Sequence, residues 1–187
     1  IYEIRNAHTN TVSRIKYINY KRFASASLDN TVKIWDLNKS YLLLTIALHT
    51  SSVMGLETLS SNLMASCSMD TTILIWSYID GSLVYYLSSH TLGVTSLKLL
   101  SNGYLASGSY DNTIKIWNWR NQTVIFTLLS HTNAILALEI VQNGSLASGS
   151  ADYTIKIWNP EVGKLLRRLF GHNGPVSYLK YLNKNNY

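Results

Sequence analysis

Serine, histidine and aspartate form the triad of many hydrolases, and this sequence contains all three within one short stretch. His90, Ser107 and Asp111 lie within 21 residues of one another. In a triad the serine hydroxyl attacks a carbonyl carbon, the histidine accepts the hydroxyl proton, and the aspartate orients the histidine ring. One hypothesis is therefore a Ser-His-Asp hydrolase.

The same residue types recur along the whole chain, which argues against a single active site. A triad is one constellation beside an oxyanion hole, whereas copies at a fixed interval indicate architecture. We therefore expect no catalytic residue and no enzyme activity. The residues that recur every 41 positions are His8, His49, His90, His131 and His172; Asp29, Asp70, Asp111 and Asp152; and Trp35, Trp76, Trp117 and Trp158.

Each 41-residue interval has the pattern of four short strands. In the third interval we expect strands at residues 94–100, 105–109, 113–117 and 123–129, rich in β-branched residues. Asn102-Gly103 predicts a tight hairpin with positive φ at both central positions, and Tyr110-Asp111-Asn112 predicts a second turn. No segment has sustained helical periodicity. The fold class is all-β, built from four-stranded antiparallel units that must stack to bury their faces.

These intervals resemble the repeats of the WD40 family. LASGSYDNTIKIWN, from Leu105, returns 41 residues later as LASGSADYTIKIWN. A histidine near the start of each unit and a tryptophan closing the third strand are family features. The Gly-His and Trp-Asp pairs survive only at Gly171-His172 and Trp35-Asp36. The resemblance implies a β-propeller, in which four-stranded blades surround a channel.

The resemblance also implies how the chain is divided. We expect about four and a half blades, a partial ring that is a fragment of a seven-blade ring. Residues 172–187 would start a further repeat, with a first strand beginning at Val176. The expected parts are 1–7, the last strand of a preceding blade; four complete repeats at 8–48, 49–89, 90–130 and 131–171; and 172–187.

In the family, the recurrent polar residues form a buried hydrogen-bonded set, and the resemblance transfers that role here. The tryptophan N–H meets a strand serine, the serine meets the histidine, and the aspartate fixes the histidine ring. Buried polar groups destabilise a fold unless they are paired. Ser109 is the less favoured serine of the third set. The sets are His8, Ser25, Asp29 and Trp35; His49, Ser66, Asp70 and Trp76; His90, Ser107, Asp111 and Trp117; and His131, Ser148, Asp152 and Trp158.

Family members bind partners at three positions per repeat: three and five residues after the histidine, and directly before the turn aspartate. None of the fourteen residues at these positions here is charged. Phosphopeptide binding would require arginines there, because guanidinium pairs with phosphate. Flexible methionine and aromatic side chains suit protein contacts, although packing between blades is an equal alternative for any one residue. The candidate partner-binding residues are Leu28, Met54, Met69, Thr95, Tyr110 and Leu136.

Composition excludes other classes. The net charge is +6, but the sixteen basic residues are scattered, so we expect no specific nucleic-acid binding. No stretch is long and apolar enough to suggest a membrane span. Cys67 is the only cysteine, which precludes an internal disulfide and a cysteine metal site. No nucleotide or metal motif is present, so we expect no cofactor and no metal. A cytoplasmic or nuclear location fits these features.

The sequence thus favours a non-enzymatic protein-interaction scaffold that binds other proteins or peptides. Its remaining partners would be further blades of the same protein or a second copy through self-association. An alternative is the substrate-receptor or sensor portion of a larger protein, such as a ubiquitin ligase or a signalling ATPase. The Ser-His-Asp hydrolase is the least favoured alternative, because its residue types recur in four copies at a fixed interval.

Overall fold

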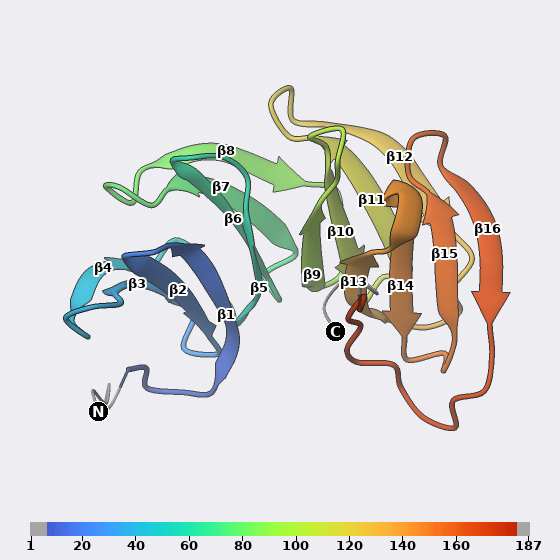
Figure 1. The fold of residues 1–187 in the computed structure, drawn as a ribbon, viewed down its shortest axis with the longest axis horizontal. Helices are drawn as coiled ribbons and strands as arrows, with labels where there is room; N and C mark the ends of the chain where they lie inside the picture. The colour runs from blue at the N-terminus through green and yellow to red at the C-terminus, as the bar shows by residue number, and fades with distance from the viewer. Residues whose placement is uncertain (1–6, 183–187) are drawn as a thin grey trace. The chain divides into compact units, whose positions relative to one another are not determined.

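The computed structural model describes residues 7–182, which form almost only β-strands (Figure 1). The strands build four four-stranded antiparallel sheets, each following the order of the chain, so the all-β prediction is confirmed. A short 3-10 turn, η1 (Gln142–Gly144), precedes β14. Sheet 1 contains β1 (Val12–Asn19), β2 (Arg22–Ser27), β3 (Val32–Asp36) and β4 (Leu42–Ile46); sheet 2 contains β5 (Val53–Thr58), β6 (Leu63–Ser68), β7 (Thr72–Ser77) and β8 (Leu83–Ser88); sheet 3 contains β9 (Val94–Leu99), β10 (Leu105–Ser109), β11 (Thr113–Asn118) and β12 (Thr123–Leu129); and sheet 4 contains β13 (Ile135–Ile140), β14 (Leu146–Ser150), β15 (Ile155–Asn159) and β16 (Lys164–Leu169).

The chain divides into two compact units, residues 1–97 and 98–187. The first unit contains sheets 1 and 2, and the second contains β10 to β12 and sheet 4. The boundary falls within β9. The described part of the chain has no helix long and apolar enough to cross a membrane.

The strands of the third repeat match the predicted ones to within one residue at each end. The turn between the first two strands differs from the prediction. Only Gly103 has a positive φ, of 81°, and Asn102 does not. The N–H groups of Gly103 and Leu100 donate to the carbonyls of Leu100 and Tyr104 respectively. One glycine in the left-handed region is therefore enough to close this turn.

The strand predicted at Val176 does not form, because no strand is assigned over residues 170–182. Val176 is nevertheless buried, and its N–H donates to the carbonyl of Ser150 at 3.0 Å. A strand needs a ladder of hydrogen bonds with a neighbour, and no described residue supplies a second strand for this segment. Residues 1–6 of the predicted N-terminal strand and residues 183–187 lie outside the described residues.

The core lies between adjacent sheets, because each sheet is apolar on both faces. In the first unit, Ala24, Ile34 and Ile46 of sheet 1 share one cluster with Val53 and Trp76 of sheet 2. In the second unit, the residues at the same repeat positions share another cluster: Ala106, Ile116 and Leu128 with Ile135 and Trp158. Fully burying each large apolar side chain contributes about 1.5–3 kcal/mol. The 41-residue repeat is thus a repeat of one packing interface.

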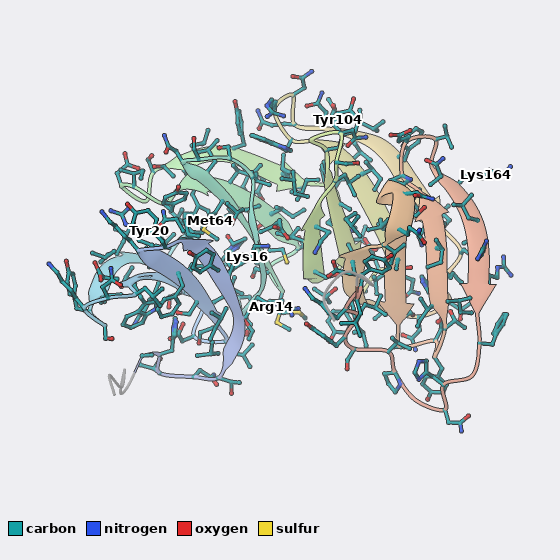
Figure 2. The ribbon with its side chains drawn as sticks, viewed as in Figure 1. Arg14, Lys16, Tyr20, Met64, Tyr104 and Lys164 are labelled. Carbon is teal, nitrogen blue, oxygen red and sulfur yellow. The ribbon has the colours of Figure 1, made fainter. Side chains whose placement is uncertain are left out.

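An ion pair accompanies each of these two interfaces. Lys16 projects from β1 (Figure 2), and its Nζ lies 2.5 Å from Oε1 of Glu57 on β5. Forty-one residues along from each partner, the Lys98 Nζ lies 2.9 Å from Oε1 of Glu139. The same position therefore alternates between lysine and glutamate, and it is lysine again at Lys180. Opposite charges at one position help neighbouring repeats to recognise each other, since like charges there would repel.

This alternation predicts the outcome of a charge reversal. Lys98→Glu alone places two glutamates together in a partly buried site and should lower the free energy of unfolding by about 1–3 kcal/mol. Adding Glu139→Lys should restore most of that loss, because an ion pair forms again with its ends exchanged. Urea unfolding of both variants measures the difference, with Lys98→Met as the uncharged control. If the double variant is no more stable than the single one, the pair does not contribute to packing.

Candidate functional site

The recurrent serine, histidine, aspartate and tryptophan form a continuous chain of hydrogen bonds in the first, second and fourth repeats. In the first repeat, Nδ1 of His8 lies 2.9 Å from Oδ2 of Asp29, and Nε2 lies 2.7 Å from Oγ of Ser25. The Trp35 Nε1–H donates to the same Ser25 hydroxyl at 2.8 Å. Since an ionised carboxylate only accepts, Nδ1 carries the histidine proton, and the serine hydroxyl donates to Nε2.

The second and fourth repeats have the same chain of contacts, with every distance between 2.7 and 3.0 Å. In the third repeat Trp117 Nε1–H donates to Ser107 at 2.8 Å, so Ser107 rather than Ser109 is the acceptor, as predicted. Asp111 there accepts from the N–H and the hydroxyl of Thr113. The tryptophan-to-serine hydrogen bond expected from the resemblance is therefore present in all four repeats, and the histidine contacts are those described for the first, second and fourth.

The aspartate is the electrostatic centre of each set. Asp70 accepts four hydrogen bonds: from Nδ1 of His49, from the N–H of Thr50, and from the N–H and hydroxyl of Thr72. Burial by itself would raise the pKa of Asp70, but these hydrogen bonds and the nearby histidine hold it below its ordinary value. Burial lowers the pKa of His49 and of His131, although each has a carboxylate partner that opposes the shift. In the second and fourth repeats these shifts favour an ionised aspartate beside a neutral histidine.

The contacts are those of a triad, but the arrangement cannot perform triad chemistry. Ser66 and Ser148 are at most 1% exposed, so no carbonyl can reach their hydroxyls. Each of these hydroxyls also accepts a hydrogen bond from a tryptophan N–H, which occupies a lone pair that a nucleophile would use. The sets hold the strands and turns together and have no exposed reacting atom. Within residues 7–182 no group of three or more histidine, cysteine or acidic side chains could hold a metal ion.

The candidate partner-binding residues differ in their exposure. Met69 and Tyr110, both directly before a turn aspartate, are 37% and 41% exposed. Leu28, Met54 and Leu136 are half-buried, and Thr95 is 6% exposed and so offers little surface. Gly93 lies so close to Met69 that a Cβ there would come within 3 Å of its sulfur. The methionine side chain thus rests on a glycine rather than in the core.

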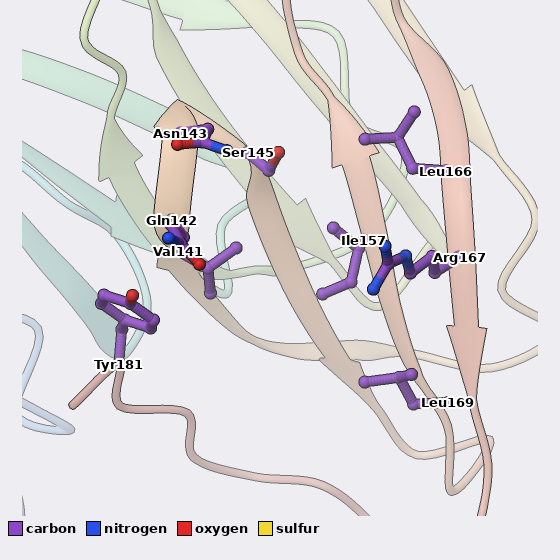
Figure 3. Close-up of a pocket in the computed structure, with 9 residues that line it drawn as sticks. All are labelled: Val141, Gln142, Asn143, Ser145, Ile157, Leu166, Arg167, Leu169 and Tyr181. Atoms are coloured by element: carbon purple, nitrogen blue, oxygen red, sulfur yellow. The ribbon is translucent and has the colours of Figure 1, made fainter. Parts of the chain in front are cut away.

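In the second unit, one packing face of sheet 4 carries apolar residues whose counterparts in sheet 3 are covered. Ile116 and Leu128 of sheet 3 are almost fully buried in the cluster shared with sheet 4. Their counterparts one repeat later, Ile157 and Leu169, line a pocket of about 470 Å³, and Leu169 is 45% exposed (Figure 3). Val141, Leu166 and Tyr181 complete the apolar part of its lining.

Sheet 1 exposes the opposite packing face. Val12 and Ile15 are 40% and 64% exposed, whereas their counterparts Val53 and Leu56 in sheet 2 are at most 4% exposed. The exposed face of sheet 1 corresponds to the face that sheet 2 turns toward sheet 1, and the exposed face of sheet 4 corresponds to the face that sheet 1 turns toward sheet 2. The two halves of the repeated packing interface are thus each exposed once, the first in unit 1 and the second in unit 2.

Comparison with known families gives a clear result. The family model "WD domain, G-beta repeat" matches residues 2–36, 40–77, 81–118 and 122–159, which together make up most of the chain. Each match ends next to the tryptophan of the third strand, and the second, third and fourth matches each combine the last strand of one sheet with the first three strands of the next. Comparison with curated proteins finds no match.

Removal of one turn aspartate tests the hydrogen-bonded set. Asp152→Ala leaves the Thr154 and Thr132 N–H groups and the His131 ring without their acceptor, and should lower the free energy of unfolding by about 1–3 kcal/mol. Asp152→Asn keeps the shape of the side chain and part of its accepting capacity, and should lose less. Thermal unfolding checks this order, and equal stability of all three proteins would contradict it.

The histidine and aspartate pKa shifts predict a loss of stability in acid. A histidine whose folded pKa lies below its ordinary value of 6.5 disfavours folding as the pH falls below that value, since the unfolded chain then binds more protons. Asp70 and Asp152, whose pKa values are lowered from 3.8, add a further loss below about pH 4. The melting temperature should therefore fall from pH 7 to pH 5 and faster below pH 4. The variant His49→Asn/His131→Asn should have a shallower slope between pH 7 and pH 5, and an unchanged slope would contradict the prediction.

Proposed function

Because the chain belongs to the WD40 family, whose repeats generally act as protein-interaction scaffolds, we propose that it binds partner proteins through the turns that precede its buried aspartates. The family is also generally non-enzymatic, in agreement with serines that no substrate can reach. The activity is thus the rigid presentation of side chains to a partner.

The observation that supports this proposal most is the exposure of Met69 and Tyr110 on turns that are themselves fixed. The N–H of Asp70 donates to Ser68 Oγ, and the N–H of Asp111 donates to Ser109 Oγ, so the residue before each aspartate is held in place. A side chain on a rigid turn loses little backbone entropy when it binds. Methionine and tyrosine are residues that contribute strongly at interfaces.

The chemistry of these positions favours an uncharged, partly apolar protein segment. None of the fourteen residues at the three family positions is charged, so they favour neither a phosphate group nor a strongly acidic or basic peptide. The free packing faces, with Ile15 in sheet 1 and Leu169 in sheet 4, suit another repeat of the same pattern, either of the same protein or of a second copy. A cytoplasmic or nuclear location is part of the proposal.

Paired substitutions test the proposal. Met69→Asp and Tyr110→Asp, alone and together, place a charge on each turn, and the double variant should retain at most a tenth of the partner captured from a cell lysate by the original chain. Ile79→Asp, at a position 57% exposed in a different turn, is the matched control and should bind normally. Melting temperatures show that each variant is folded. Full capture by a folded double variant would overturn the assignment of these turns as the binding surface.

A further inference from the structure

One position of the repeat, twenty-five residues after the histidine, is lysine in three repeats and leucine in the second. The residues are Lys33, Leu74, Lys115 and Lys156. In the fourth repeat the ammonium of Lys156 is buried and donates to the carbonyl of Ser130 at 2.5 Å. In the first repeat the ammonium of Lys33 donates to the carbonyl of Ala7 at 2.7 Å. In both cases the acceptor is the residue directly before the histidine.

The fourth repeat also shows that the turn aspartate attracts this ammonium. The Lys156 Nζ lies 3.7 Å from Oδ2 of Asp152, although that carboxylate already accepts the four hydrogen bonds of its own set. Both side chains are almost fully buried, so their attraction is only weakly screened by water. In this fold, a carboxylate that already accepts four hydrogen bonds can therefore still hold a lysine ammonium beside it.

The second repeat has the same acceptors without the lysine. Asp70 makes the same four hydrogen bonds as Asp152, and its side chain is only 9% exposed. The pKa of Asp70 is lowered, as is that of Asp152. Leu48 stands in the place of Ser130. Leu74 is buried in the core cluster and carries no charge to offset the carboxylate.

A pocket of about 230 Å³ lies at this place. Asp70 and Thr72 line it from the turn, Leu48 from the loop before β5, and Leu74, Leu83 and Tyr86 from β7 and β8. Leu83 and Tyr86 are about half exposed, at 48% and 53%, so the pocket is accessible from solvent. It thus combines a buried carboxylate, aliphatic walls and an aromatic ring.

We propose that this pocket binds the ammonium group of a lysine side chain from a partner protein, which takes the place that Lys33 and Lys156 take in their own repeats. The aliphatic walls suit the methylene stem of lysine, which packs on apolar surface while its ammonium reaches polar groups. Tyr86 adds an aromatic ring to the lining, a residue type that attracts cations. A metal ion is disfavoured, because Asp70 is the only acidic side chain of the lining and hard cations require several oxygen ligands.

The pocket deepens the proposed scaffold function, because it names a side chain that a partner would supply, but its test does not depend on any captured protein. The probe is lysine blocked as its N-acetyl methylamide, titrated against the whole 187-residue chain. Backbone amide shifts of Thr50 and Thr72, measured by NMR, should saturate. The blocked norleucine analogue, which lacks the ammonium, should bind at least tenfold more weakly. Equal binding of the two probes, or no binding of lysine, overturns the proposal.

Leu74→Lys provides the sharpest variant, because it restores the residue type of the other three repeats. Its ammonium should fill the pocket and weaken binding of the blocked lysine at least tenfold. Since Leu74 belongs to the core, the exposed Leu83 gives a second test: Leu83→Lys should weaken binding through charge repulsion, and Leu83→Met should not. Unchanged binding in a folded Leu74→Lys or Leu83→Lys protein overturns the proposal. Tenfold tighter binding of putrescine than of blocked lysine would overturn the assignment to a protein side chain.

Discussion

The fold depends on one buried carboxylate in each repeat. Asp29 illustrates its role, since it accepts hydrogen bonds from the His8 ring, from the N–H of Thr9 before β1, and from both polar groups of Thr31 at the start of β3. Through the histidine its influence extends to Ser25 on β2 and Trp35 on β3. Two strands and two loops thus share one charged acceptor, and the charge is tolerated because every one of its lone pairs is used.

The same arrangement explains why a triad-like set of residues is inert. Catalysis requires a nucleophile with an open approach, whereas this fold places Ser25, Ser66 and Ser148 under a tryptophan inside a sheet interface. The polar chain is complete without any substrate. It positions the residue before the aspartate at the surface, and there the repeats differ: leucine, methionine, tyrosine and alanine stand at Leu28, Met69, Tyr110 and Ala151.

Departures from the repeat are therefore the places where function can be sought. At Leu74 the departure removes an internal cation from beside a carboxylate that the fold cannot omit, because Asp70 still supports His49, Thr50 and Thr72. At Leu169 the residue type is kept but its covering repeat differs, which leaves an apolar side chain exposed. The first departure leaves space beside a carboxylate where a partner can supply a positive charge, and the second leaves an apolar side chain exposed.

The sequence by itself determined the secondary structure, the repeat and the buried polar sets. The strands follow from alternating and β-branched residues and the turns from residues such as Gly103, whereas the polar sets were expected from the resemblance to the WD40 family. The alternation of lysine and glutamate at Lys16 and Glu57 can also be read from the sequence. The distance between the two side chains was needed to show that they form an ion pair.

Only the tertiary structure decided which apolar and charged groups are covered. Val176 has the sequence of a strand start, but it forms no strand, since a strand needs a paired neighbour. Ile116 and Ile157 are identical in sequence context, yet one is fully buried and the other lines a pocket, because burial depends on what packs against a face. The pocket at Asp70 likewise arises from the joint positions of Leu48, Leu74 and Tyr86, which lie on three separate segments. Local sequence specifies the strands and turns of each repeat, whereas the solvent exposure of a side chain depends on which sheet packs against it.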